Sequence, residues 1–166
     1  GVGGYSLRYT TTGAGNTGVG AYALRANSTG GSNTAVGYQA LDGNTTASYN
    51  TAVGTNALYA NTTGTPNTAV GYFALDSNTT AGNNTAVGYD ALTAATTGGA
   101  NTGLGHNCGK GITTATGNTA VGAYSNDAAS MSGADNTSVG YYSLSANTTG
   151  TRNAVLGTSC LGANTT

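Results

Sequence analysis

Apolar and polar residues follow one another along this chain in a pattern that repeats every 17 residues. The motif N-T-A-V-G begins at Asn33 and returns at this spacing, and only the step from Asn118 to Asn136 is longer, at 18 residues. Copies of the motif, including close variants of it, begin at Asn16, Asn33, Asn50, Asn67, Asn84, Asn101, Asn118, Asn136 and Asn153. A fixed period of this kind is typical of repeat proteins whose units stack on one another.

Each position of the repeat has its own residue type. The fifth residue of the motif is Gly, and four residues later the chain usually has Leu, as at Gly37 and Leu41. The fourth residue is aliphatic, and the alternation in T-A-V predicts a strand whose aliphatic side chain points into the core. This predicted core column contains Val19, Val36, Val53, Val70, Val87, Leu104, Val121, Val139 and Leu156.

The repeat predicts an all-β fold, a parallel β-solenoid or β-roll of about ten 17-residue coils. A unit of this length is too short for two helices and a turn, and Gly, Asn and Thr are poor residues for a helix interior. Two or three short strands joined by tight turns fit the length. Because neighbouring strands lie ~4.8 Å apart, ten stacked coils would form a rod about 48 Å long.

The array continues through the sequence, so we expect a single repeat array of residues 1–166. Both ends fall within a copy of the repeat, which predicts that the chain is a window of a longer fibre. Residues 101–135 depart most from the pattern, since Gly109 and Ile112 replace the usual Leu and Asn and the next copy has the extra residue. We expect a bulge or loop in these coils, and a specialised contact site there if the rod has one.

Composition argues against several classes of function. Leu, Ile, Val and Phe make up 21 of 166 residues, fewer than the core of an ordinary globular enzyme needs. Four Lys or Arg residues cannot form the basic surface that binds phosphate groups, so we expect no nucleic-acid partner. The sequence contains no run of about 18 apolar residues, so we expect no segment that inserts into a membrane. The sequence offers no nucleophile–base pair, carboxylate pair or phosphate-binding loop, so we predict neither an enzyme nor a cofactor.

The core predicted for each coil is thin. A few aliphatic side chains bury little apolar area, whereas fixing the backbone of one coil costs ~17–30 kcal/mol of conformational entropy. Packing against other chains would bury the aliphatic column further. We therefore expect self-association, as a trimer or a filament.

With the motif N-T-A-V-G-x-x-A-L the chain resembles the head repeats of trimeric autotransporter adhesins, whose coils contain a similar S-V-A-I-G-x-x-A element. The V-G-x-x-A-L part recurs at residues 36–41 and 70–75, and the resemblance covers essentially the whole chain. It implies a left-handed parallel β-roll with three chains around one axis, displayed on stalks at bacterial surfaces. Phage tail fibres are similar in this respect. The coil here is longer than is typical of the family, because it includes an additional N-T-T segment.

The N-T-T segments contain N-x-S/T sequences, which are acceptors for N-linked glycans. Six of the eight share one position of the repeat and would line one edge of the rod, which predicts a glycan-coated edge. The alternative is that Asn and Thr simply suit turns and stack by hydrogen bonding. The eight predicted acceptors are Asn27, Asn44, Asn61, Asn78, Asn83, Asn136, Asn147 and Asn164.

Two further columns could contact partners. Stacked Thr residues of the motif, such as Thr34 and Thr51, raise the hypothesis of ice binding, although Thr is also an ordinary strand residue. Tyr residues cluster in the two positions after the repeat Gly, where one position should face outward and could stack on sugars or pack against another chain. Packing between coils is the alternative for these residues, of which the predicted contacts are Tyr38, Tyr72, Tyr89 and Tyr141.

The two cysteines share one position of the repeat, three coils apart. A separation of ~14 Å excludes an intrachain disulfide between Cys108 and Cys160. A buried free thiol is the simplest interpretation, and pairing with another chain stays open. His106 and Cys108 could face one way as metal ligands, but a metal site needs three or four ligands, so a surface substitution is simpler for His106.

These observations predict a non-enzymatic structural and adhesive fibre module. We expect it to be extracellular, at a cell surface or on a virion, and to contact surface glycans or a host receptor. The main alternative is the shaft of a phage or virion tail fibre, and an ice-binding solenoid is a further one.

Overall fold

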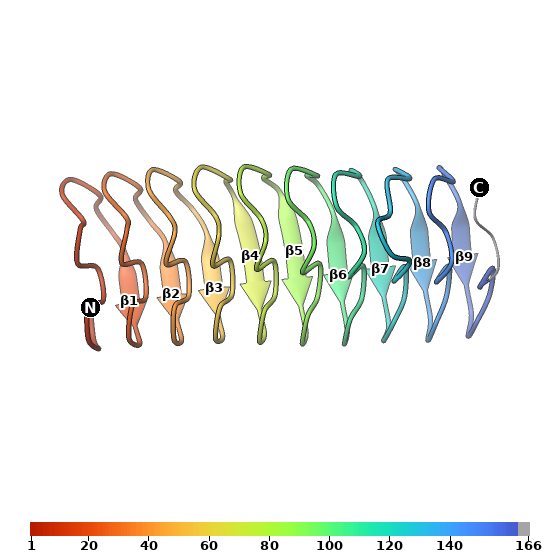
Figure 1. The fold of residues 1–166 in the computed structure, drawn as a ribbon, viewed down its shortest axis with the longest axis horizontal. Coiled ribbons are helices and arrows are strands. Elements are labelled where there is room, and N and C mark those ends of the chain that lie inside the picture. The colour runs from red at the N-terminus through yellow and green to blue at the C-terminus, as the bar shows by residue number, and fades with distance from the viewer. Residues whose placement is uncertain (163–166) are drawn as a thin grey trace.

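The computed structural model describes residues 1–162, which form one rod of stacked coils (Figure 1). Each coil contributes one short strand to a nine-stranded sheet, and no helix occurs among these residues. The prediction of an all-β parallel solenoid with a 17-residue repeat is confirmed. The strands are β1 (Thr17–Val19), β2 (Thr34–Val36), β3 (Thr51–Val53), β4 (Asn67–Val70), β5 (Asn84–Val87), β6 (Thr102–Leu104), β7 (Thr119–Val121), β8 (Thr137–Val139) and β9 (Ala154–Leu156).

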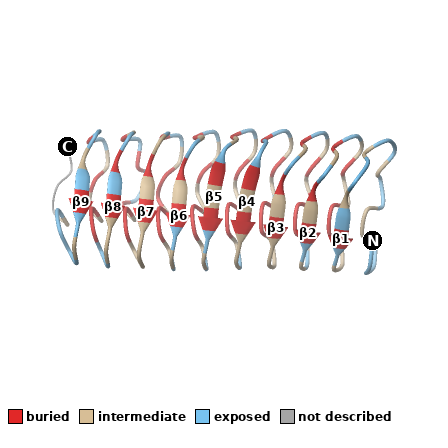
Figure 2. Cartoon of the chain, turned by 180° about the vertical axis from the view of Figure 1, so that it is seen from behind, coloured by how far each residue is buried: buried red, intermediate tan, exposed pale blue. Residues whose placement is uncertain are grey.

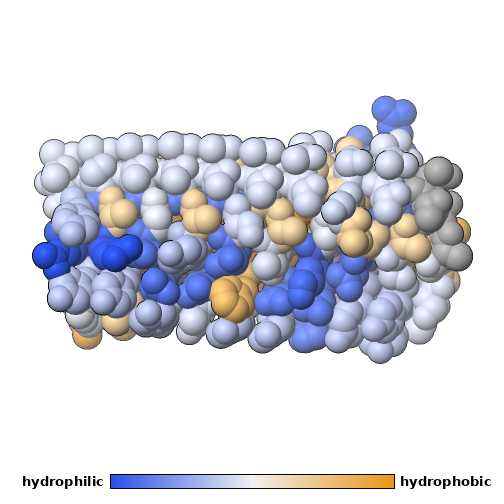
Figure 3. Space-filling model, viewed as in Figure 1, coloured by the Kyte–Doolittle hydropathy of each residue, from blue (hydrophilic) through white to orange (hydrophobic). Residues whose placement is uncertain are grey.

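All neighbouring strands are parallel and pair in the phase of the repeat. Thr34 pairs with Thr51, and Val36 pairs with Val53, so each residue lies beside its counterpart in the next coil. The longer spacing between β7 and β8 does not disturb this register, because Val121 still pairs with Val139. The extra residue is therefore accommodated in the turns of that coil. Side chains of similar hydropathy consequently form rows along the rod (Figure 3).

The inner residue of each strand is the small one, so the predicted core column was wrong. Ala35 is fully buried, whereas the next residue, Val36, exposes 36% of its surface. Figure 2 shows the same arrangement along the sheet, with buried positions within strands that are otherwise partly exposed. None of the nine residues of the predicted column is buried, and these are Val19, Val36, Val53, Val70, Val87, Leu104, Val121, Val139 and Leu156.

The reason is space inside the coil. At Gly103, which occupies the inner position of β6, an added Cβ would lie 2.9 Å from Leu92 Cγ and 3.2 Å from Cys108 Sγ. Even a methyl group would be too close to Leu92 here, so the larger side chain of the strand turns outward. The inner residues of β1–β8 are accordingly Gly18, Ala35, Ala52, Ala69, Ala86, Gly103, Ala120 and Ser138, and β9 is the exception, with Val155 inside.

The large core side chains come from the turn after the strand. Leu41 and Leu58 are fully buried, with φ values of 52° and 53°. A left-handed conformation costs a bulky residue about 1–2 kcal/mol, and burying a Leu side chain gains about 1.5–3 kcal/mol. The conformation also lets the N–H of Leu41 donate to the carbonyl oxygen of Ala57 in the next coil, at 3.0 Å.

The Gly after each strand is required by close approach between coils. At Gly71, φ is 140°, and an added Cβ would lie 2.2 Å from the carbonyl oxygen of Gly88. No other residue could occupy this position without moving the next coil, because a Cβ never approaches a backbone oxygen so closely.

Candidate functional site

The sheet presents an apolar column to the outside of the rod. In β1–β8 the Thr and the aliphatic residue point outward on the same side, because the inner residue lies between them, and in β9 Ala154 takes the place of the Thr. Val19, Val87 and Leu104 expose 39%, 39% and 38% of their surface. We call this surface the Val–Thr face, and it consists of the outward residues of β1–β9. These strands contain only Asn, Thr, Ala, Gly, Ser, Val and Leu, so the face has no charge.

The predicted edge of glycan acceptors does not exist at the surface, so this prediction was wrong for most of its residues. Asn44 and Asn61 are fully buried, and the outer residue of the segment is the second Thr, as at Thr46 and Thr63. A glycan is attached to the side-chain nitrogen, which here lies inside the coil. The buried members are Asn27, Asn44, Asn61, Asn78, Asn136 and Asn147.

Hydrogen bonds explain why these amides are inside. Asn61 Nδ2 donates to Asn44 Oδ1 at 3.1 Å and to the carbonyl oxygen of Gly64 at 3.1 Å. The bond to Asn44 links neighbouring coils, and the bond to Gly64 closes the turn of the same coil. A buried amide is stable only when its donors and acceptors are paired, and stacking identical coils supplies these pairs.

Two of the eight predicted acceptors differ from this group. Asn83 is exposed, and its glycosylation stays a prediction. Asn164 lies outside the described residues.

The four predicted Tyr contacts all lie at the surface. Tyr38, Tyr72, Tyr89 and Tyr141 expose between 43% and 51% of their surface. The rings also pack between coils, since Tyr72 and Tyr89 are stacked with centroids 5.3 Å apart and an angle of 7° between the planes. Contact with a partner stays a prediction for this Tyr column, whose outer edges are accessible.

His106 continues the Tyr column and is separated from Cys108. Its ring is exposed and stacks on Tyr89 with centroids 5.3 Å apart, whereas Cys108 is fully buried and its thiol donates to the carbonyl oxygen of Gly105 at 3.0 Å. The two side chains therefore point to opposite sides of the backbone. Among residues 1–162 no group of three or more His, Cys, Asp or Glu side chains could hold a metal ion.

The irregular coils exchange the positions of their core residues. Ile112 and Met131 are fully buried in the column that contains buried Asn elsewhere, and they form an isolated bridge with each other. Gly109 and Asn126 occupy the position that is usually Leu. Both side-chain polar atoms of Asn126 are buried, without a hydrogen-bond partner in the described part of the chain. The core of these coils is therefore more apolar at the turn of Ile112 and Met131, and less apolar at the turn of Gly109 and Asn126.

Among residues 1–162, charged side chains form two ion pairs between coils. Arg25 donates to Asp42 at 2.8 Å, and although this contact lowers the pKa of Asp42, burial outweighs it and the pKa is raised. Lys110 donates to Asp90 at 2.9 Å, which raises the pKa of Lys110. Burial also raises the pKa of Asp127. These groups connect neighbouring coils, and their carboxylates are occupied by or close to cations.

Among the hollows on the surface of residues 1–162 are two that adjoin aromatic or amide side chains. One, of about 250 Å³, is lined by Tyr5, Arg8, Tyr9, Tyr22 and Arg25, and its guanidinium groups lie over the Tyr rings. The other, of about 230 Å³, lies between the coils of β4 and β5. Sequence reasoning did not identify either hollow.

Comparison with models of protein families, with curated proteins and with solved structures found no match for this chain. No helix in the described residues is long and apolar enough to cross a membrane.

Proposed function

We propose that this chain is a non-enzymatic structural segment of an extracellular fibre, and that copies of it associate through the Val–Thr face. The observation that carries the proposal is the outward column of aliphatic side chains, which continues in register through all nine strands. The extracellular location rests on the resemblance to adhesin head repeats. The exposed Tyr column supports an adhesive contact on the same rod.

A second copy of the chain is the occupant that fits the Val–Thr face best. Contiguous apolar surface on a soluble protein marks a contact site more often than chance exposure does. The face has no charged residue, so two or three copies can approach without repulsion. Each coil adds one more Val and one more Thr, so the buried area grows with the length of the rod.

The molar mass in solution tests this proposal. Light scattering or sedimentation should give a multimer for the native chain and a monomer for a variant with Val36, Val53, Val70 and Val87 all changed to Thr. Thr keeps the β-branched shape, so circular dichroism of the variant should be unchanged. The control variant has Thr29, Thr46, Thr63 and Thr80 changed to Ser at an exposed edge, and should remain a multimer. A monomeric native chain would overturn the proposal.

Ice binding is a second candidate, supported by the same face. Thr and Val point outward together in every strand except β6 and β9, and their hydroxyl and methyl groups form a two-column array along the rod. Such an array could order water. The adjacent Thr side chains of an N-T-T segment could not, because they point to opposite sides. A native chain that lowers the freezing point without forming a multimer would favour this function over the fibre.

A further inference from the structure

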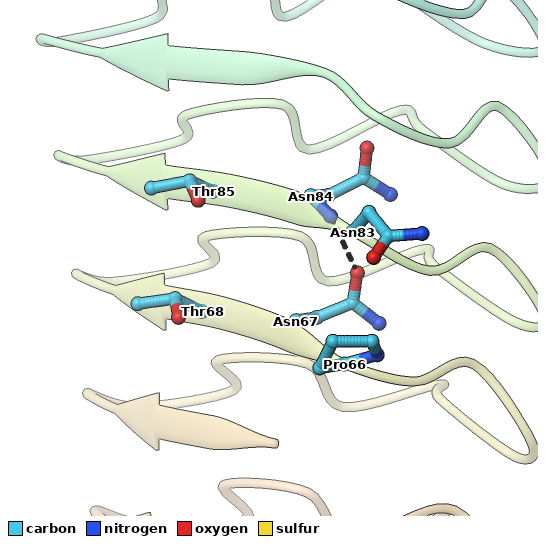
Figure 4. A pocket seen from close by; sticks show the side chains of 6 residues that line it. All are labelled: Pro66, Asn67, Thr68, Asn83, Asn84 and Thr85. Carbon is cyan, nitrogen blue, oxygen red and sulfur yellow. Dashed lines mark hydrogen bonds between the residues drawn. The ribbon is translucent and has the colours of Figure 1, made fainter. Parts of the chain in front are cut away.

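The hollow between β4 and β5 lies where Pro66 interrupts the repeating surface of the rod (Figure 4). It has a volume of about 230 Å³ and lies along the first residues of the two strands. β4 and β5 each begin at Asn, one residue earlier than the strands on either side of them. The residues that line the hollow are Pro66, Asn67, Thr68, Asn83, Asn84 and Thr85.

Pro66 accounts for this local difference. In other coils the residue before the motif Asn donates its N–H to the preceding coil, as Tyr49 does to the carbonyl oxygen of Gly31 at 3.1 Å. Pro66 has no N–H, and the hydroxyl of Thr65 instead donates to the carbonyl oxygen of Ser48. The chain has no other proline, so this arrangement occurs once.

The next coil responds to the change at Pro66. The N–H of Asn83 donates to the carbonyl oxygen of Pro66 at 2.6 Å, whereas the equivalent N–H of Ala100 returns to the usual type of acceptor, the carbonyl oxygen of Gly82. Asn83 has a φ of 63°, and its side chain is exposed beside the Pro66 ring (Figure 4). The strand residues Asn67, Thr68, Asn84 and Thr85 therefore form the base of the hollow, and Pro66 and Asn83 lie at its edge.

Some polar side chains of the hollow form hydrogen bonds within the described chain, and others do not. Asn67 Oδ1 accepts the N–H of Asn84 at 3.0 Å, and Asn84 Nδ2 donates to the carbonyl oxygen of Gly98 at 3.1 Å. The side-chain amide of Asn83 and the hydroxyls of Thr68 and Thr85 make no hydrogen bond within the described residues. One amide and two hydroxyl groups are thus available to a ligand, and none of the lining residues is charged.

Apolar groups complete the arrangement. The exposed Pro66 ring borders the hollow and is the apolar surface of its lining. A pyranose ring has an apolar face of C–H groups and a rim of hydroxyls, which matches the Pro66 ring beside amide and hydroxyl partners. The absence of charge from the lining gives no advantage to phosphate, sulfate or a uronic acid.

We propose that this hollow binds one neutral hexopyranose unit of a saccharide. The volume holds a single ring, so the affinity of one site is on the order of millimolar. The site lies at the start of the strands, and the Val side chains lie at their end. Thr68 and Thr85 also belong to the Val–Thr face, so the sugar site and the association surface share these two residues. Sugar binding to the separated chain does not require self-association, and a sugar site would give the fibre an adhesive contact.

Nuclear magnetic resonance of ¹⁵N-labelled, unglycosylated chain tests the proposal with methyl β-glucopyranoside as the probe. The glucoside should shift the side-chain amide signals of Asn83 and the backbone signals of Thr68 and Thr85 with millimolar saturation. Methyl β-glucuronide, inorganic phosphate and the open-chain polyol sorbitol serve as comparison ligands and should shift them less. The titration is repeated on the variant with four Val changed to Thr, so that association and sugar binding are measured separately.

A matched pair of variants locates the site. Asn83→Gly removes the amide and keeps the positive φ, as Gly15 and Gly117 do in the same column, and should weaken binding about tenfold. Ser32→Gly makes the same kind of change at a corner without a hollow, and should leave binding unchanged. Absence of shifts from both the native chain and the Val-to-Thr variant, equal shifts with sorbitol, or equal loss in both Gly variants would overturn the proposal.

Discussion

The side-chain amides of Asn33 and Asn44 donate to the same carbonyl oxygen, that of Ala47, at 2.8 and 3.0 Å. All three residues belong to the copy of the repeat that begins at Asn33, and Asn33 and Asn44 occupy different positions in it, so one acceptor joins two columns of buried Asn. Gly30, Ala81 and Gly150 are acceptors of the same type. Columns of hydrogen-bonded Asn side chains thus connect the coils inside the rod and add to the stability that the small apolar core provides.

Asn44→Ala should destabilise the rod by about 2–4 kcal/mol, because it removes several buried hydrogen bonds and leaves partners without them. The bonds lost are to Ala47, to Asn27 Oδ1 and from Asn61 Nδ2. Urea unfolding followed by circular dichroism measures the change. Thr46→Ala, two residues away at the surface, is the control and should change stability by less than about 0.5 kcal/mol. Equal effects of the two variants would contradict the role of the ladder.

The orientation of the strands predicts opposite responses at two adjacent residues. Ala35→Val places a larger side chain in the filled interior and should cost about 1–3 kcal/mol, with partial loss of the strand signal on heating. Val36→Ala removes an exposed side chain and should cost less than about 1 kcal/mol in the separated chain. Thermal unfolding at low protein concentration distinguishes them. A larger loss of stability from Val36→Ala than from Ala35→Val would mean that Val36, and not Ala35, packs in the core.

The 17-residue period was enough to predict the fold, because stacking identical coils in register is the simplest way to pair every strand. It was not enough to decide which side of the strand is inside. Val36 is the larger apolar residue and was expected in the core, but the interior beside Leu24 and Ala40 admits only a small side chain. A signal was present, since the residue before the outward aliphatic one is Gly, Ala or Ser in eight strands.

Burial of Asn was missed for a related reason. Asn is usually a surface or turn residue, so the N-x-T sequences at Asn44 and Asn61 indicated exposed acceptors. In a solenoid each buried amide finds its partner in the identical residue of the next coil, and this pairing is visible only once the coils are stacked. The hollow at Pro66 and Asn83 depends on a single departure from the repeat, which a search for regularity passes over.

The two thiols should differ in reactivity. Burial raises the pKa of Cys108 to about 12, so almost no thiolate forms near neutral pH, and its side chain is inaccessible. Cys160 is exposed. A coloured disulfide reagent should therefore label one thiol per native chain and two after unfolding in urea. Cys160→Ala should abolish native labelling and Cys108→Ala should leave it, because Ala occupies the position of Cys108 in five other coils. Rapid labelling of Cys108 would mean that this coil opens readily.

Mild acid should stabilise the rod. Burial, with a contribution from nearby Asp90, raises the pKa of Asp76, and its Oδ1 atom has no hydrogen-bond partner among the described residues. A raised pKa in the folded state means that the folded chain binds the proton more tightly than the unfolded chain. The stabilisation from protonation is therefore complete below the unfolded pKa and is lost as the pH rises through the folded pKa.

The melting temperature should accordingly rise as the pH falls from 7 to about 4. Asp76→Asn is uncharged at every pH, and should melt higher than the native chain at neutral pH and depend less on pH. Asp135→Asn, at an exposed corner, is the control and should follow the native chain. A fall in melting temperature on acidification, unchanged by Asp76→Asn, would contradict this account.

The coil of Gly109 and Ile112 has Gly in place of the usual Leu and Ile in place of the usual Asn. Substituting the usual residues tests whether these two differences compensate each other. A Cβ on Gly109 would lie 2.7 Å from Leu92 Cδ2 and 3.0 Å from Ile112 Cδ1, so Ile112 fills space that the Leu of other coils occupies. Gly109→Leu alone should overpack the core and cost about 1–3 kcal/mol. Ile112→Asn alone removes apolar contacts opposite a Gly and should cost about 2–4 kcal/mol.

The double variant should be more stable than the sum of these losses predicts, with a coupling energy of about 1–3 kcal/mol. The φ of Gly109 is 59°, close to that of Leu92 at 51°, so a Leu is compatible with the backbone. The Asn introduced at position 112 could donate to the carbonyl oxygen of Ala115, which already accepts from Asn101 at 2.9 Å. Unfolding in urea for the four proteins of the cycle gives the coupling. Additive losses would mean that Ile112 stabilises the coil independently of the missing Leu.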